Sequence, residues 1–373
     1  MADLKYRIDD LGDRRVLTLG GRTYPPTRYS KRVIEMLVER KQERAPLYFP
    51  FKETRGPLYL DPLLRWLRAH GARALAVLEV GCSFGHMTEY LAEQREIATI
   101  DAFDTDPKFV EIARAKLGEL QLDRVREVRL FSNDETRRLP WPDGVFDLVL
   151  AIGVVEHLPR DRRAQVNEYY RVLAPGGHIA ILDTPNRLFP LETHSIGLPL
   201  VQWMSPPLAF RYARLCRPRK LRGFAWADFV ADGTGWRNAS LAECLPSSRW
   251  TGLEDLTEAA GYGWRFFRDT ARSRTRRAVL PLFAPLCAAL AVAGRPPSLA
   301  LPYFNLPTPS ARDYLRVTSA DGSSKIPPDQ PMVYVWPASP AVLHMVRASR
   351  LAPIRFQSRP SQACMFTTPI VPA

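Results

Sequence analysis

The segment from Glu79 to Gly85 reads EVGCSFG and follows an apolar run, with small residues at Gly81, Ser83 and Gly85. Small residues permit a tight strand-to-helix turn, so that the backbone can approach a ligand closely. The helix that follows offers free N–H groups to an anionic group. Two interpretations fit: a cofactor-binding turn, or a hydrolase elbow with Ser83 as nucleophile. The elbow normally follows a later strand, and this turn follows the first one, which favours cofactor binding.

An acidic residue stands at the end of the next apolar run. Asp104 lies 19 residues beyond Gly85, where a carboxylate can accept hydrogen bonds from both hydroxyls of a ribose. Its alternative role is a helix N-cap, but Asp106, followed by Pro107, already fits that position. The glycine-rich turn and the acid together predict a nucleoside cofactor. They do not separate NAD from S-adenosylmethionine.

Short apolar runs alternate with longer amphipathic runs around these residues. We expect helices over about residues 85–94, 107–118 and 162–173. Strands alternating with crossover helices imply a parallel sheet covered on both faces, which is a doubly wound α/β fold. The expected strands are Leu75–Val80, Ile97–Phe103, Val125–Phe131, Phe146–Ile152 and Ile179–Asp183.

Four further motifs follow in order along this segment. They are Asn133-Asp134-Glu135, the run LPWPDGVFDLV over 139–149, VVEHL over 154–158 and RVLAPGG over 171–177. The series resembles the class I S-adenosylmethionine-dependent methyltransferases of types 11 and 23 over about residues 75–186, and TPNR at 184–187 also fits. The resemblance implies a Rossmann-like, mostly parallel, seven-stranded sheet with S-adenosyl-L-methionine as cofactor.

The resemblance also assigns roles to the glycine-rich turn. Gly81, Ser83 and Gly85 would surround the methionine and ribose portion of the cofactor, and Glu79 would brace the loop. The sequence departs from the family at Ser83, where glycine is usual. Because serine is also small, we expect cofactor binding to survive.

Further cofactor contacts are implied at the ends of later strands. Asp104 would hold the ribose, and Thr105 would pack near the adenine. Asp134 or Glu135 would contact the adenine amino group, since the spacing leaves these two positions open. The backbone at Ala151 and Ile152 would meet the methionine end.

Two histidines are candidate catalytic residues. Methyl transfer depends mainly on holding donor and acceptor in line, but an oxygen acceptor must also lose a proton to a base. His157 follows the fourth strand on the side where α/β sheets bind ligands, and its alternative role is a structural cap. His194 opens the following segment, and its alternative is an ordinary surface histidine. The related ubiquinone-pathway enzymes hold a metal with an acid where this chain has Gly153, so we expect no metal.

The remaining segments frame this core. We expect an N-terminal helical or cap segment over 1–70, the cofactor-binding core over 71–186, and an aromatic-rich insert over 187–250 that is either a substrate lid or a packed subdomain. Residues 251–306 would end the fold, with a helix from Thr251 to about Ala260, a sixth strand over Tyr262–Phe267 and a seventh beginning at Ser298–Leu306. Residues 307–373 would form an irregular, poorly ordered tail.

The apolar run 278–293 is shorter than a spanning helix requires and contains Pro281 and Pro285. We interpret it as a buried helix or a hydrophobic lip of a substrate pocket. The alternative is peripheral membrane contact in the lipid interface.

Composition limits the compartment and the partners. Five dispersed cysteines favour neither a zinc site nor a disulfide framework, and no secretory signal opens the chain, so we expect a cytoplasmic protein with an option of membrane association. The net charge is +13, but residues 1–258 contribute only +3 and residues 259–373 contribute +10. No RNA-binding signature accompanies this excess, so we expect no nucleic-acid partner.

These observations predict a methyltransferase acting on a small or lipid-linked acceptor, at oxygen. One alternative is a catalytically inactive binding protein with the same fold. Another is a nucleic-acid methyltransferase, but the sequence after the fourth strand is Ala151-Ile152-Gly153-Val154 instead of the Pro-Pro motif of base amino-group methylation.

Overall fold

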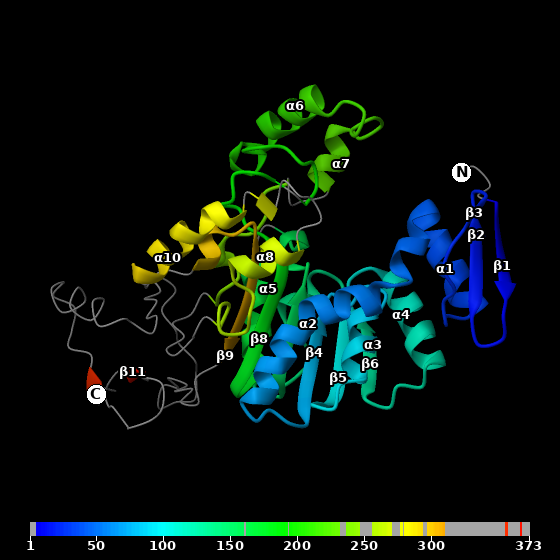
Figure 1. Cartoon of the computed structure of the whole chain (residues 1–373), viewed down its shortest axis with the longest axis horizontal. Coiled ribbons are helices and arrows are strands. Elements are labelled where there is room, and N and C mark those ends of the chain that lie inside the picture. Colours follow the sequence, from blue (N-terminus) through cyan, green and yellow to red (C-terminus); the bar gives the residue numbers. More distant parts are fainter. Residues whose placement is uncertain are drawn as a thin grey trace. The chain divides into compact units, whose positions relative to one another are not determined.

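The computed structural model divides the chain into two compact units, Met1–Thr136 and Arg137–Ala373 (Figure 1). The structure describes residues 5–159, 162–192, 194–231, 236–246, 256–270, 277–278, 280–293, 297–309, 355–356 and 366–367.

The first unit contains a parallel ladder in the order β6-β5-β4. Strand β4 is almost entirely buried, which is typical of a strand in a covered parallel sheet. Val80 lies opposite Phe103, so the carboxyl ends of β4 and β5 are neighbours. Ligands bind at this edge of open α/β sheets. The elements are β4 Leu75–Val80, α3 His86–Ala92, β5 Ile97–Asp104, α4 Pro107–Glu119 and β6 Val125–Leu130.

The N-terminal segment contains a small sheet as well as helices. Antiparallel strands β1 to β3 come first, and helix α1 then begins after Ser30, whose Oγ accepts a hydrogen bond from the Val33 amide at 3.2 Å. The expectation of a helical or cap segment therefore omitted the sheet. The elements are β1 Tyr6–Asp10, β2 Arg15–Leu19, β3 Arg22–Thr23, α1 Lys31–Lys41, the 3₁₀ helix η1 Gln42–Tyr48 and α2 Phe51–Ala69.

This segment packs against α3 and α4 through a core and a buried ion cluster. Residues of α1 share a hydrophobic cluster with Phe84 and Ile112. The buried carboxylate of Glu89 in α3 lies 3.0 Å from Lys116 Nζ of α4 and also pairs with Arg28. Since a buried charge is costly unless it is paired, the N-terminal segment helps to stabilise the helix after the glycine-rich turn.

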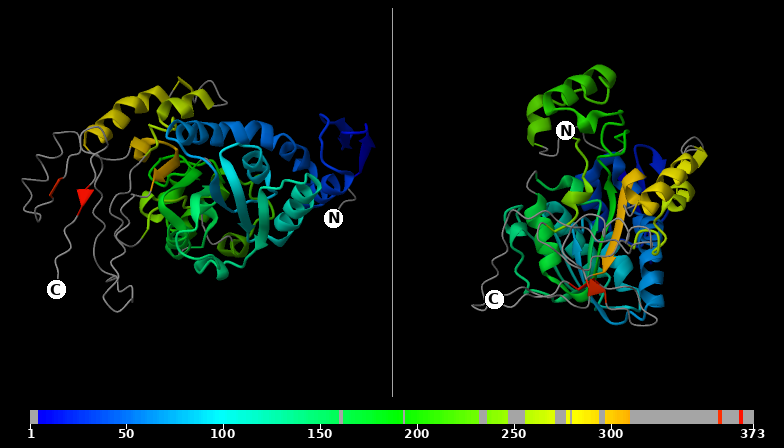
Figure 2. Two further views of the ribbon diagram at one scale, coloured as in Figure 1. Left: turned by 90° about the horizontal axis from the view of Figure 1, so that it is seen from below. Right: turned by 90° about the vertical axis from the view of Figure 1, so that its left-hand side faces the viewer.

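The second unit contains the parallel pair β7 and β8, with β9 antiparallel to β8. Helices α6 and α7 extend beyond the ends of β8 and β9 in the views of Figures 1 and 2. The helices and strands are β7 Phe146–Ile152, α5 Arg162–Arg171, β8 Leu173–Pro185, α6 Pro206–Cys216, α7 Trp226–Ala231, α8 Trp264–Thr270, α10 Ala284–Val292, β9 Tyr303–Pro309, β10 Arg355–Phe356 and β11 Phe366–Thr367. The short 3₁₀ helices are η2 Glu135–Arg137, η3 Val155–His157, η4 Val201–Trp203, η5 Leu241–Glu243, η6 Leu280–Phe283 and η7 Pro297–Ala300.

The predicted α/β fold class is confirmed, with parallel strands flanked by helices. Three parallel strands lie in the first unit and two in the second, with one antiparallel strand after them. The described residues of these ladders thus supply six of the seven strands that the resemblance implies. The seventh strand is not among them.

The predicted sixth strand over Tyr262–Phe267 is wrong, because helix α8 occupies this position. Tyr262 lies just before this helix, and its ring centroid is 5.3 Å from that of Phe266 within it. The predicted helix from Thr251 falls partly outside the described residues, and 257–260 form a turn. The strand expected to begin over Ser298–Leu306 is β9, which begins at Tyr303 and continues to Pro309.

The apolar run 278–293 is mostly exposed. Cys287 is buried, whereas Leu282 and Val292 are 74% and 71% exposed. The interpretation as a buried helix is therefore wrong for most of this segment. No helix among the described residues is long and apolar enough to cross a bilayer. The predicted tail 307–373 lies outside the described residues except for the end of β9 and the short β10–β11 pair.

Candidate functional site

The turn between β4 and α3 adopts the left-handed conformation at three alternate residues. The φ angles are +67° at Gly81, +49° at Ser83 and +69° at Gly85. Glycine adopts such angles without strain, and serine does so less readily. A Cβ on Gly85 would come within 2.9 Å of Leu117, so this position also requires the smallest residue for packing. The sequence-predicted small residues thus shape the turn.

Asp104 ties this turn to the end of β5. Its carboxylate accepts hydrogen bonds from the Ser83 amide at 2.8 Å and the Asp106 amide at 2.9 Å. Burial raises the pKa of Asp104, while these amides oppose the rise. Each carboxylate oxygen retains acceptor capacity beyond one amide, so the group can still bind hydroxyl donors. Asp106 is the predicted N-cap, since its Oδ1 accepts from the Lys108 amide at 2.9 Å.

Glu79 lies beneath the turn and is 3% exposed. Its Oε2 accepts a hydrogen bond from Thr88 Oγ1 at 2.5 Å. Burial raises the pKa of Glu79 to about 7, against the opposing effect of that hydrogen bond. The residue therefore links the end of β4 to α3 from inside the unit.

The two acids left open as adenine contacts differ in their surroundings. The Glu135 carboxylate accepts from the Ser132 amide at 2.6 Å, and the Glu135 amide donates to Ser132 Oγ at 3.2 Å. This reciprocal pair is a capping arrangement that engages Glu135 locally. Asp134 is exposed, as is Thr105 at the end of β5.

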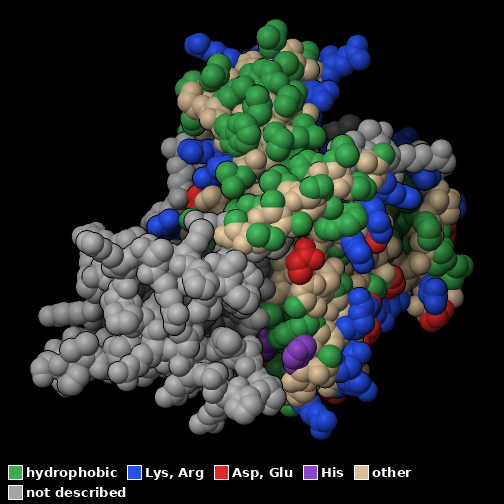
Figure 3. Space-filling model, turned by 60° about the vertical axis from the view of Figure 1, so that its left-hand side comes forward, with side chains coloured by type: hydrophobic (Ala, Val, Ile, Leu, Met, Phe, Trp, Pro, Cys, Tyr) green, Lys and Arg blue, Asp and Glu red, His purple; other side chains and the backbone are tan. Residues whose placement is uncertain are grey.

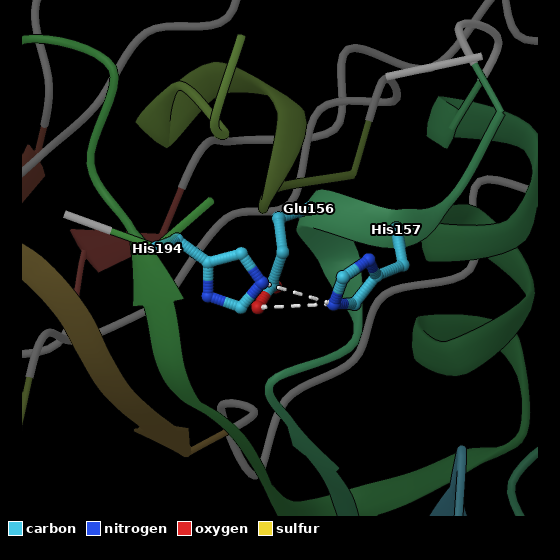
Figure 4. Close-up of side chains that lie close together, drawn as sticks. All are labelled: Glu156, His157 and His194. Carbon is cyan, nitrogen blue, oxygen red and sulfur yellow. Dashed lines mark hydrogen bonds and ion pairs between the residues drawn. The ribbon is translucent and has the colours of Figure 1, made fainter. Parts of the chain in front are cut away.

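The second unit brings the two candidate histidines together (Figure 4). His157 stands in η3, shortly after β7, which ends at the half-buried Ile152. Its Nε2 lies 3.2 Å from Nε2 of His194 and 4.0 Å from Oε1 of Glu156. The histidines are exposed, whereas Glu156 is 3% exposed. A shared hydrogen bond therefore joins residues that lie 37 positions apart.

A buried carboxylate fixes the backbone that carries His194. Glu192 is fully buried and accepts four backbone hydrogen bonds, from the amides of His194 at 2.8 Å, Ser195 at 2.6 Å, Ile196 at 2.7 Å and Gly197 at 3.0 Å. Carboxylate–amide bonds of this length are strong, because the acceptor is charged. Glu192 is a positioning residue that sequence reasoning missed, although its signal was an acid two residues before His194.

Neighbouring motif residues anchor the start of the insert. The buried side-chain amide of Asn186 donates to the carbonyls of Leu299 at 3.1 Å and Leu301 at 2.8 Å. Arg187 donates to the Asn238 carbonyl at 3.1 Å and pairs with Glu243 at 2.8 Å. The TPNR sequence thus connects the end of β8 to two later segments.

The cluster of Glu156, His157 and His194 offers two kinds of chemistry. The imidazole pair can accept and share a proton. Among the described residues, these three side chains also place a potential metal-ligand atom each within 4.8 Å of one another. Burial, followed by the nearby Asp183 carboxylate, raises the pKa of Glu156 to about 8. The expectation of no metal at this cluster stays a prediction.

Comparison with known proteins identifies the class of domain. The sequence profile described as a methyltransferase domain matches residues 78–179. The chain is 30% identical to the ubiquinone biosynthesis O-methyltransferase of Xylella fastidiosa, over 46% of this chain and 65% of that protein. It is 32% identical to norajmaline N-methyltransferase of Rauvolfia serpentina, over 47% of this chain and 54% of that protein.

One solved structure also shows a low overall similarity to this chain. The SAM-dependent methyltransferase of Aquifex aeolicus is 22% identical, with a TM-score of 0.32, over 50% of this chain and 88% of that chain. This chain spans about half the length of the first curated relatives that it matches. Residues 78–179, which the methyltransferase-domain profile matches, contain the glycine-rich turn, Asp104 and His157.

Proposed function

Because residues 78–179 form a class I methyltransferase domain of the S-adenosylmethionine-dependent kind, we propose that this protein methylates a hydroxyl oxygen of a small or lipid-linked acceptor. The observation that supports the choice of oxygen is the His157–His194 pair, because an oxygen acceptor needs a base. Curated relatives carry out both O- and N-methylation by name, so nitrogen is the alternative outcome.

Most of the proposed cofactor contacts belong to the first unit. In this proposal, Gly81, Ser83 and Gly85 approach the methionine and ribose portion, and Asp104 accepts the ribose hydroxyls. Asp134 or Glu135 contacts the adenine amino group, and Ser132 holds Glu135 in a local capping arrangement. Glu79 braces the turn, and Thr105 completes the contacts proposed for this unit.

The proposed base is the histidine pair. When both rings are neutral, one Nε2 donates to the other, so the 3.2 Å contact holds a single proton. An acceptor hydroxyl would give its proton to the unprotonated nitrogen while its oxygen forms a bond to the methyl carbon. Gly81, Ser83, Gly85 and Asp104 would hold S-adenosylmethionine, which would supply the methyl group and retain the electron pair of the broken carbon–sulfur bond as a neutral thioether. Glu192 positions His194 for this step.

The preference for an acceptor with a hydrophobic part rests on exposed apolar residues. Leu282 and Leu286 are 74% and 50% exposed, and the insert is rich in aromatic residues. In this proposal such surfaces contact a lipid-linked acceptor or, through 278–293, the membrane in which it resides.

Cofactor binding is tested by titration calorimetry with S-adenosylmethionine. Asp104→Ala should weaken binding by about 10- to 100-fold, since it removes a charged acceptor. Asp123→Ala changes an exposed acid beyond α4 and should leave the affinity unchanged. If the wild-type protein is folded and does not bind the cofactor, the proposed function is wrong.

The base is tested by measuring S-adenosylhomocysteine release with a panel of phenolic, prenylated and sugar-linked hydroxyl acceptors. His157→Gln and His194→Gln should each lower kcat by about 10²-fold or more and leave cofactor affinity unchanged. His70→Gln alters an exposed histidine of the first unit and is the matched control. Unchanged kcat in both site variants would exclude the pair as base. Binding without transfer to any acceptor would favour an inactive binding protein.

A further inference from the structure

The insert contains a lobe, residues 196–231, with its own small core. Helix α6 begins with Pro206 and Pro207, which suit the first turn of a helix. Ala209, Phe210 and Ala213 are buried on one side of α6. They belong to a cluster that includes Phe229 of α7 and Trp236. The lobe is therefore a packed element with an outer surface of its own.

The outer side of α6 exposes leucines as well as arginines, whereas a solvent-facing helix is usually polar. Leu208 and Leu215 are 54% and 81% exposed. They are seven residues apart and so lie on the same face of the helix, with Arg211 between them. Two leucines that are exposed beside an arginine give this helix an apolar stripe with a cationic flank.

Helix α7 adds a second exposed apolar pair. Trp226 and Val230 are 43% and 56% exposed and lie one helical turn apart. The Trp226 ring is 5.4 Å from the ring of Phe210, so α7 packs beside α6. Figure 3 shows hydrophobic side chains gathered over this upper lobe, with Lys and Arg side chains at its margins.

The lobe is strongly basic although the chain before residue 259 is nearly balanced. Its charged residues are Arg211, Arg214, Arg217, Arg219, Lys220, Arg222 and Asp228, a net charge of +5. A hollow at the end of α6 is lined by Arg217, Arg219 and Lys220 together with Ile196 and Cys216. Cations and exposed apolar side chains thus share one small element.

We propose that α6 and α7 dock this lobe onto an anionic lipid surface. The leucines, Trp226 and Val230 would enter the headgroup boundary, and the arginines would meet lipid phosphates. Tryptophan suits this depth, since its ring is apolar and its N–H is polar. The helices would lie in the interface, because neither is long enough to span a bilayer.

The charge pattern favours lipid over other partners. A nucleic acid would engage the arginines but would gain little from leucines at 208 and 215. The other exposed apolar helix, α10, has no charged residue over 280–293, so it cannot supply a preference for anionic lipid. The lobe combines exposed apolar side chains with a positive net charge.

The proposal is tested by flotation of the full chain with vesicles of phosphatidylcholine alone or with about one-third phosphatidylglycerol. We expect binding to the anionic vesicles and at least tenfold weaker binding to the neutral ones. Leu208→Asp/Leu215→Asp should lower binding to anionic vesicles at least tenfold. Arg211→Gln/Arg214→Gln should reduce the dependence of this binding on salt concentration. Neither cofactor nor acceptor is needed, so the result is independent of the proposed function.

The control is Leu11→Asp, which places the same charge at a leucine that is 61% exposed in the first unit and should not change binding. Circular dichroism checks that each variant is folded. Loss of binding with the arginine variant but not the leucine variant would identify a general polyanion site and overturn the proposal. The proposal would also be overturned if Leu286→Asp in α10 abolished vesicle binding while the lobe variants still bound. Absence of binding to anionic vesicles would also overturn it.

Discussion

Two carboxyl groups keep their protons to unusually high pH in this protein. Burial raises the pKa of Glu79 to about 7 and that of Glu156 to about 8. Neither group forms an ion pair that would offset its loss of hydration fully. The folded state therefore binds protons that the unfolded chain releases at lower pH, and stability must depend on pH.

The sign of this effect is testable at Glu79. Unfolded, the group releases its proton near pH 4.5; folded, near pH 7. The protonated group therefore contributes stability that is fully present below about pH 4.5 and is lost as pH rises through 7. The total loss in the free energy of unfolding is about 3 kcal/mol. Glu79→Gln keeps an acceptor for Thr88 and does not titrate.

Urea unfolding at pH 5 and pH 8 measures this difference. The free energy of unfolding of Glu79→Gln minus that of the wild type should be larger at pH 8 than at pH 5. A difference between the two proteins that does not change with pH would show that Glu79 ionises normally in the folded state.

The residues of the site were predictable one at a time, but not their contacts. The strand ends indicated Asp104 and His157, because α/β folds bind ligands there. The 3.2 Å contact of His157 with His194 depends on the path of the insert, which no local pattern encodes. Glu192 was missed for the same reason, since its four partners are backbone amides that exist only in the folded turn.

At the scale of elements, buried strands were the most predictable features. Leu75–Val80 and Phe146–Ile152 agree with β4 and β7, because continuous apolar runs leave little ambiguity. Tyr262–Phe267 was misread because aromatic residues favour strands when spacing is ignored. The N-terminal sheet was missed although Gly20-Gly21, between short runs, is a hairpin signal.

Packing between helices α2 and α3 requires a glycine at position 56. A Cβ there would lie 2.5 Å from ring atoms of Tyr90. Replacing glycine by alanine within a helix normally stabilises it by about 1 kcal/mol. At Gly56 we expect the clash to reverse the sign, with Gly56→Ala destabilising the protein by about 1–3 kcal/mol. Thermal unfolding measures the change.

Gly118 in α4 provides the matched control. A Cβ at this position would meet no atom within 4 Å, so Gly118→Ala should be neutral or stabilising by up to about 1 kcal/mol. If both variants change stability in the same direction, the contact between Gly56 and Tyr90 does not limit packing.

At the scale of the whole molecule, we expect β9 to be the last strand that the second unit requires for stability. It pairs with β8 from Tyr303 to Pro309. We expect a chain ending at residue 309 to retain cooperative unfolding and cofactor affinity. A chain ending at 302 should lose several degrees or more of melting temperature, because it removes a paired strand and exposes an edge. Equal melting temperatures for the two truncated proteins would contradict this expectation.

The turn at Glu192 is an anion site whose anion belongs to the protein itself. Its four converging amides would bind a small anion if the side chain were absent. Glu192→Gly should therefore lower turnover, and added formate or acetate should restore it by binding to the amides. Alcohols with the same number of carbon atoms should not restore it, because they carry no charge. Recovery of His194-dependent turnover with rising formate concentration would give an apparent affinity for the vacated turn. The same protein would then work as a carboxylate-activated enzyme.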